Sequence, residues 1–400
     1  MAPPSGPELL GEAQRLLPAL SSLRRDLHRH PELGGQEQRT ASRITKALQR
    51  LGLEVRTGVA GNGVVGLLRA GAGATSPAAA MRADIDALPV QEGSDVPYRS
   101  LVPGVSHACG HDGHTAILLG AAELLRRHAA DLPGDVLFVF QPSEDTLPGG
   151  ARAMVREGVL GRARGVLSLH LNPLFSAGTV ALREGWATCS SVSFRLRLQG
   201  RGGHVADPGH ALNPLLPAAA LVTAAEELRR ELAAEAEPLI LAFGSLHGGT
   251  AANVIPEAVE ASGSLRAPSP ELLQGALARF RELARTITEK AGACFQLELE
   301  EGYPPVFNDP ALTAAFREAA ASVVGSDRVT SPDRALATGD DVAFFHREVP
   351  GVYWQLGCSE PARGFVHPLH SPRFDFGEEL LALGAAVQAK AVLSLPPAKA

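Results

Sequence analysis

Side chains that bind metal ions gather in one short stretch of the sequence, residues 107–114. Cys109 and His111 are separated by a single glycine, so on an extended segment they can face the same way. Thiolate and imidazole together suit zinc and other borderline metal ions. A buried cysteine beside a capping histidine explains this tripeptide as well, but the further histidines and the aspartate around it favour metal binding.

Two adjacent carboxylates, Glu144 and Asp145, follow an apolar run at residues 137–140. Neighbouring side chains of an extended chain point in opposite directions, so the two can do different jobs. One can bind a metal ion while the other contacts the water bound to that ion. A solvated acidic turn is the ordinary alternative, but the apolar run argues against it because it ties this loop to the core.

Two histidines elsewhere in the chain, His170 and His370, could complete a metal site. His170 follows a predicted buried strand, where a hydrogen-bonded core histidine is equally expected. His370 lies in a proline-containing segment typical of loops, so neither residue identifies a ligand by itself. His28 and His30 precede Pro31, and we predict a structural role for both, in capping or packing.

The predicted elements bring these clusters to one edge of a sheet. Short apolar runs predict buried strands at 78–83, 136–140, 165–169 and 352–356, and apolar spacing predicts helices at 9–27, 40–51, 115–128 and 377–393. This alternation implies a parallel sheet with helices on its faces. The first three strands run directly into acidic or histidine clusters, and in such sheets ligand sites form beyond the carboxyl ends of the strands.

The pattern changes near residue 190. Residues 191–198 alternate polar and apolar, which predicts a half-exposed strand. Helices at 215–233 and 270–291 and strands at 240–246, 258–266 and 295–301 follow. They predict a small antiparallel sheet with two helices, inserted as one block. We therefore expect a discontinuous catalytic domain, 1–189 and 303–400, interrupted by a lid or dimerisation domain, 190–302.

Composition narrows the class of protein. A chain of 400 residues favours two domains, and the net charge of -6 with scattered basic residues argues against nucleic-acid or membrane partners. Four cysteines, spread widely, do not resemble a disulfide framework. The first residues lack the features of a signal peptide, and no apolar stretch is long enough to span a bilayer. A cytoplasmic location is therefore expected.

The chain resembles the amidohydrolase branch of the M20 metallopeptidase superfamily, which includes hippurate hydrolases, N-acyl-amino-acid amidohydrolases and plant auxin-conjugate hydrolases. The resemblance spans nearly the whole chain, and its motifs occur in one order. They are RRDLHRHPE at 24–32, RADIDALP at 82–89, HACGHDGH at 107–114, QPSED at 141–145, GH at 203–204, GGTAANVIP at 248–256 and HSPRFDF at 370–376. Any one of these motifs is a weak signal, but their joint occurrence is specific.

The resemblance implies a zinc-exopeptidase-like α/β fold with an inserted α+β lid. It assigns the general base to Glu144 and a catalytic lid role to His204, which would stabilise the oxyanion. It places Asn253 and Arg266 near the substrate, and Asp86 beneath the site. The implied metal ligands are Cys109, His111, Asp145, His170 and His370.

The implied activity is hydrolysis of the amide bond of small N-acyl amino acids, by water activated at a two-metal centre with a glutamate base. Zinc or manganese is expected, with cobalt or nickel as alternatives, and a homodimer would form through the lid. A dipeptidase, or a deacetylase of an N-acetylated amino-acid intermediate, is the nearest alternative. A cysteine hydrolase using Cys109 and a non-catalytic binding protein are more remote ones.

Several positions depart from the usual pattern of this branch. Asp145 stands where glutamate is common, so the ligand is one methylene shorter. Pro208-Gly209-His210 replaces the usual Pro-His of the lid, Asn213 replaces an aspartate, and residues 340–342 differ as well. These changes bear on substrate preference more than on the reaction class.

Overall fold

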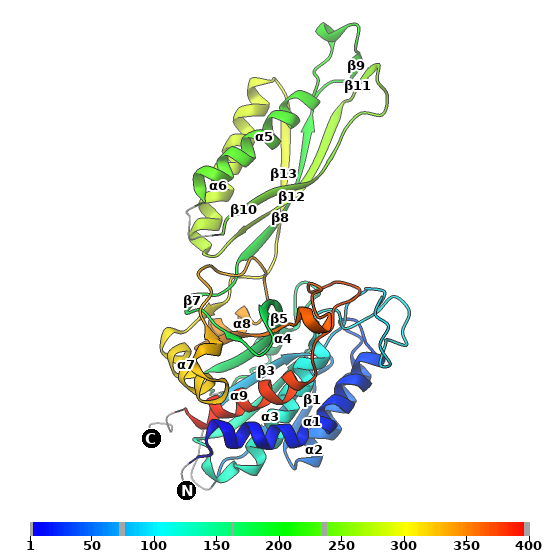
Figure 1. Cartoon of the computed structure of the whole chain (residues 1–400). Coiled ribbons are helices and arrows are strands. Elements are labelled where there is room, and N and C mark those ends of the chain that lie inside the picture. Colours follow the sequence, from blue (N-terminus) through cyan, green and yellow to red (C-terminus); the bar gives the residue numbers. More distant parts are fainter. Residues whose placement is uncertain (1–2, 72–76, 162, 234–237, 396–400) are drawn as a thin grey trace. The chain divides into compact units, whose positions relative to one another are not determined.

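The computed structural model describes residues 3–71, 77–161, 163–233 and 238–395 (Figure 1). The chain divides into two compact units. The first contains residues 1–185, 307–332 and 341–400, and the second contains residues 186–306 and 333–340. The short strands β7 (Gly185–Trp186) and β14 (Phe307–Asn308) lie in the chain where this division falls.

An eight-stranded sheet forms the centre of the first unit. Its strands, in spatial order, are β1 (Glu54–Val59), β2 (Gly63–Leu68), β4 (Asp135–Gln141), β3 (Pro77–Asp84), β5 (Val166–Ser176), β16 (Gly351–Ser359), β6 (Val180–Ala181) and β15 (Val329–Thr330). The four middle strands, β4, β3, β5 and β16, run parallel. Every residue of β4 is buried, as expected for a strand covered on both faces. The predicted α/β fold class is therefore confirmed.

The helices of the first unit pack largely against one another and against the sheet. They are α1 (Gly6–Arg29), α2 (Gln38–Arg50), α3 (His111–Arg127), α4 (Gly150–Arg156), α7 (Pro310–Val324), α8 (Ala343–Glu348) and α9 (Glu379–Leu393), with 3-10 turns at Ala129–Asp131, Ser326–Arg328 and Pro361–Arg363. The helices α1, α3 and α9 contact one another, and Figure 1 shows them side by side. Their buried leucines and alanines join the apolar residues of the sheet in one core.

A smaller antiparallel sheet forms the second unit. Its strands lie in the order β10 (Ile240–His247), β12 (Ala258–Ala267), β8 (Ser190–Gln199) and β13 (Cys294–Glu301), with helices α5 (Leu215–Leu232) and α6 (Pro270–Lys290) on one side (Figure 1). The alternation in β8 buries Phe194, Leu196 and Leu198 against these helices. Ser269 caps α6 by accepting a hydrogen bond from the Leu272 N–H, at 3.2 Å. A 3-10 turn, Pro208–His210, and a pair of short strands, β9 (Gly203–His204) and β11 (Val254–Ile255), complete the unit.

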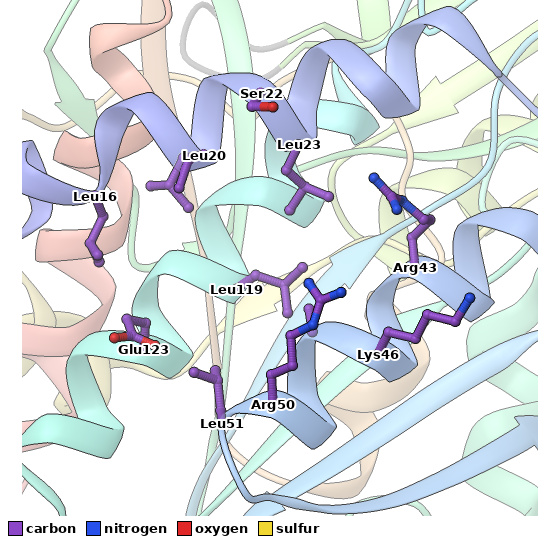
Figure 2. A pocket seen from close by; sticks show the side chains of 12 residues that line it. Leu16, Leu20, Ser22, Leu23, Arg43, Lys46, Arg50, Leu51, Leu119 and Glu123 are labelled. Carbon is purple, nitrogen blue, oxygen red and sulfur yellow. The ribbon is translucent and has the colours of Figure 1, made fainter.

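An open groove of about 640 Å³ lies between α1, α2 and α3 (Figure 2). Its lining includes apolar residues of all three helices and, from α2, the cations Arg43, Lys46 and Arg50. None of the lining residues is a predicted ligand or catalytic residue. The groove is therefore separate from the candidate site described next.

Candidate metal centre

The five predicted metal ligands come from four regions of the first unit. Cys109 precedes α3, and His111 is the first residue of that helix. His170 lies within β5, Asp145 follows β4, and His370 lies in the segment that leads to α9. We expected Cys109 and His111 on an extended segment, and this was wrong. The chain turns into the helix at Gly110, whose φ of +89° is a conformation that glycine adopts without strain.

These side chains form two groups that share the Cys109 sulfur. One group joins Cys109, His111 and His170, and the other joins Cys109, Asp145 and His370. The ligand atoms of each group lie within 4.8 Å of one another. The Cys109 Sγ is 3.5 Å from His170 Nε2, and His370 Nε2 is 3.6 Å from Asp145 Oδ1. Residues far apart in the sequence therefore meet at one place.

Hydrogen bonds fix which ring nitrogen of two histidines faces the group. His111 Nδ1 lies 2.9 Å from the Asp86 carbonyl oxygen and 3.2 Å from its Oδ1, so this nitrogen donates. His170 Nδ1 donates to the Leu171 carbonyl oxygen at 2.7 Å. The Nε2 atom of each ring is therefore the one left to face the group, which is the usual arrangement of a metal-binding histidine.

Two buried polar atoms in this cluster have no hydrogen-bond partner among the residues that the structure describes. They are His111 Nε2 and Asp145 Oδ2, and they lie 3.9 Å apart. Unpartnered buried polar groups are costly and call for an explanation. Bound cations would take up the lone pairs of these two atoms. The donor set and its spacing fit a divalent cation.

His114 is excluded as a ligand because both of its nitrogens are already used. Its Nδ1 lies 2.6 Å from Asp84 Oδ1, and its Nε2 accepts a hydrogen bond from the Leu171 N–H at 2.9 Å. Asp84 and His114 therefore support the strand that carries His170. We did not predict this role, although Asp84 at the end of a buried strand and a second histidine three residues after His111 were signals for it.

The charges around the cluster disfavour a free thiolate. Burial and the nearby Asp145 carboxylate raise the pKa of the Cys109 thiol well above its ordinary value. Burial lowers the pKa of His170, which stays neutral. Burial opposes a charge on His111, but Asp84, Cys109 and Asp86 together outweigh it and raise the pKa of that ring. An activated cysteine nucleophile needs the opposite environment, whereas a bound cation would favour the thiolate.

Asp86 and Glu144 lie beside the ligands. Asp86 Oδ2 accepts a hydrogen bond from the Asp145 N–H at 3.0 Å, so Asp86 contacts two of the predicted ligands. The Glu144 side chain is buried and belongs to neither ligand group that contains Cys109. Its charge nevertheless contributes to the raised pKa of the Cys109 thiol, so it acts on the same centre. Glu144 follows Ser143, whose φ is +54°.

The remaining predicted site residues belong to the second unit, which is described by itself. His204 and Asn253 are exposed and lie close together, because β9 pairs with β11 and Val205 N–H donates to the Asn253 carbonyl oxygen at 3.3 Å. Arg266 is half-buried on β12 and donates to the Ala337 carbonyl oxygen at 2.8 Å.

The two other histidines predicted to be structural are outside both ligand groups. His28 is buried and contacts Asp112 Oδ2 at 2.8 Å and Glu92 Oε1 at 3.2 Å. His30 Nδ1 lies 2.9 Å from the carbonyl oxygen of Asp26. His107, in the same motif as Cys109, is buried and contributes to no ligand group, and burial lowers its pKa to about 4.

The buried His28 should make stability depend on pH. Burial alone would lower its pKa, but the Asp112 and Glu92 carboxylates raise that pKa to about 9, against an ordinary 6.5. The stabilisation is therefore complete below pH 6.5 and is lost as pH rises through 9. The shift corresponds to roughly 3 kcal/mol of unfolding free energy. Urea unfolding at several pH values should show this decline in the wild type and a flatter profile in His28→Gln.

A matched control is His247→Gln, which alters an exposed histidine of the second unit. This variant should keep the pH dependence of the wild type. Equal slopes for His28→Gln and the wild type between pH 6.5 and 9 would contradict the assignment of a charged His28.

No helix within the described part of the chain is both long enough and apolar enough to cross a membrane.

Comparison with known proteins identifies the family of this chain. The model of peptidase family M20/M25/M40 matches residues 80–394. The IAA-amino acid hydrolase ILR1-like 4 of Arabidopsis thaliana is 35% identical over 377 residues, covering 92% of this chain and 83% of that protein. Thermostable carboxypeptidase 2 of Saccharolobus solfataricus is 32% identical over 370 residues, covering 92% of this chain and 93% of that protein.

A solved structure gives the same result for the fold. The Bacillus subtilis YXEP protein, described as a dinuclear metal binding peptidase from the M20 family, matches with a TM-score of 0.82 at 29% identity. The match covers 95% of this chain and 98% of that one. The predicted resemblance and the predicted metal-dependent amidohydrolase class are both confirmed. The chain belongs to peptidase family M20/M25/M40.

Proposed function

We propose that this enzyme hydrolyses the amide bond of small N-acyl amino acids at a centre of two divalent ions. The observation that carries the proposal is the convergence of two ligand groups on the Cys109 sulfur, with His111 Nε2 and Asp145 Oδ2 buried and unpartnered among the described residues. A cluster of this composition, with its histidine Nε2 atoms free to bind, fits a pair of cations better than a structural hydrogen-bond network.

Each group would hold one ion, and Cys109 would contribute to both groups. Cys109, His111 and His170 would hold the first, and Cys109, Asp145 and His370 the second. When bound, the ions would polarise the amide carbonyl and lower the pKa of a water. Zinc and manganese are the first candidates, with cobalt and nickel next, since nitrogen, sulfur and carboxylate ligands accept all four.

Glu144 would move the proton in this reaction. Its carboxylate would accept the proton of the attacking water and then deliver it to the nitrogen of the leaving amine. Its burial beside the ligands suits this role, because general bases in proteins act from sites that exclude most water. Asp86, which contacts His111 and Asp145, would hold both ligands in place.

The second unit would act as a lid over the substrate. His204 and Asn253, which lie close together on paired strands, would approach the scissile amide, with His204 stabilising the oxyanion. Arg266 would help to hold the substrate carboxylate. A homodimer formed through this unit, a cytoplasmic location and a small-molecule substrate complete the proposal.

The relatives support hydrolysis of an amide next to an amino acid. One relative is named as a hydrolase of IAA-amino acid conjugates and another as a carboxypeptidase, and both reactions break such a bond. The carboxypeptidase makes a dipeptidase the second candidate. A deacetylase of an N-acetylated amino-acid intermediate uses the same chemistry on a smaller acyl group.

Removing and restoring the metal tests the proposal directly. Protein stripped by a chelator should lose hydrolysis of an N-acyl-amino-acid panel, and two equivalents of Zn²⁺, Mn²⁺, Co²⁺ or Ni²⁺ should restore it. A dipeptide panel run in parallel separates the two candidate activities. The stripped protein could instead keep full activity and lose it only on treatment with a thiol reagent. That result would favour a cysteine hydrolase. Metal binding without turnover of any panel member would favour a binding protein.

A further inference from the structure

Arg24 is a buried cation that joins three segments of the first unit. Its side chain is 1% exposed, although it carries a permanent charge. Its Nε donates to Asp112 Oδ2 at 2.8 Å, and one terminal nitrogen donates to Asp375 Oδ1 at 2.7 Å. Tyr98 donates to the other oxygen of Asp375 at 2.8 Å. Charged groups are almost never fully buried unless they are paired in this way.

The partners of Arg24 lie next to predicted metal ligands. Asp112 directly follows His111 at the start of α3. Asp375 lies five positions after His370, in the segment that leads to α9. Arg24 therefore holds the segment that carries one ligand against the helix that carries another. We use "the Arg24 clamp" for Arg24 with Asp112 and Asp375.

The His370 side chain itself is weakly held, although its segment is anchored by the buried Phe374 and by the Gly93 N–H, which donates to the Pro372 carbonyl oxygen at 2.7 Å. The side chain of His370 is 54% exposed, so it is not held by burial. Its φ of +65° is a left-handed conformation that costs free energy for a residue with a side chain. Such a conformation persists only where the surroundings determine it. One backbone hydrogen bond, from His370 N–H to the Ala108 carbonyl oxygen at 2.8 Å, supports it directly.

We propose that Arg24 is a positioning residue of the metal centre, which keeps His370 within reach of the ion bound by Cys109, Asp145 and His370. This inference rests on the proposed function, because it needs a cation at that group. The ion bound by Cys109, His111 and His170 should depend on Arg24 much less.

The two ions should respond differently because Asp112 and Asp375 keep different partners when Arg24 is removed. Asp112 keeps His28, whose Nδ1 lies 2.8 Å from the same carboxylate oxygen and whose charge compensates it. Asp375 keeps the neutral hydroxyl of Tyr98 but loses its closest cation. The segment that contains Asp375 and His370 should therefore relax, while the start of α3 stays in place.

Arg24→Met tests this, with Arg25→Met as the matched control. Arg25 is the next residue of α1 and pairs with Glu378 of the same C-terminal segment, but it is half exposed. Zn²⁺ and Mn²⁺ binding should be measured by competition with a chromogenic chelator, together with circular dichroism and urea unfolding. In Arg24→Met one of two ions should bind about 10–100-fold more weakly and the other as in the wild type. Arg25→Met should bind both normally.

A second variant keeps the test decisive if Arg24→Met does not fold. Asp375→Asn removes the charge at the other end of the clamp without changing the size of the side chain, and it should weaken the same ion. A folded Arg24→Met or Asp375→Asn that binds both ions as the wild type does would overturn the inference, even if it unfolds more easily. A wild type that binds fewer than two ions would instead overturn the proposed function.

Discussion

Glu144→Gln is expected to lower kcat by about 10²–10⁴-fold while both metal ions remain bound. The substitution keeps the size and the hydrogen-bonding shape of the side chain but removes its ability to accept a proton. Because Glu144 belongs to neither ligand group that contains Cys109, the ligands themselves are unchanged. Steady-state kinetics on the preferred acyl-amino acid, with metal content measured on the same sample, checks both parts of the prediction.

The pH dependence of kcat/KM distinguishes a catalytic role of Glu144 from a purely structural one. In the wild type, kcat/KM should fall toward acid pH as the base becomes protonated, and this limb should disappear from the residual activity of Glu144→Gln. Glu348→Gln, the same change at an exposed position of α8, should leave the profile unaltered. Hydrolysis by Glu144→Gln at the rate of the wild type would reject Glu144 as the base.

Much of the fold was predictable because burial leaves a direct record in the sequence. The strand β4, buried at every position, contains a continuous apolar run at 136–140, and β8 alternates because only one of its faces is covered. The antiparallel sheet with two helices follows the predicted order closely. In these elements, local pattern and tertiary packing favour the same structure.

The start of α3 was predicted four residues too late, and the reason lies in the chemistry of the site. Apolar periodicity begins at Thr115, so it misses the first turn, where His111, Asp112 and His114 are all buried. These polar side chains face inward because each has a buried polar partner elsewhere: Asp86 for His111, Arg24 and His28 for Asp112, and Asp84 for His114. A pattern rule that assigns polar residues to the surface fails at such a place.

The end of β5 shows the same limit. His170 was expected at the end of a strand, but β5 continues to Ser176. The residues before and after His170 therefore both pair with β16. The candidate ligands could be named from their types and from family motifs. Their tautomers, the pairing of His114 with Asp84 and the Arg24 clamp depend on contacts between distant segments, which no spacing in the sequence encodes.

Cys109→Ser is expected to abolish binding of both ions, with a rate loss on the order of 10³-fold or more, because several kcal/mol of charge stabilisation disappear together. Cys109 is the only residue shared by the two ligand groups proposed to hold the ions. A serine hydroxyl stays protonated at neutral pH and is a poor substitute for thiolate. The measurement is metal content after dialysis, followed by turnover at saturating Zn²⁺ or Mn²⁺.

His370→Ala is the informative comparison, because His370 belongs to one of those two groups. That variant should lose one ion and keep the other, whereas Cys109→Ser should lose both. Cys294→Ser changes an exposed cysteine of β13 and should behave as the wild type. If Cys109→Ser kept both ions but lost all turnover, the sulfur would be a nucleophile rather than a ligand. The metal count therefore decides between the two chemistries, which activity alone cannot separate.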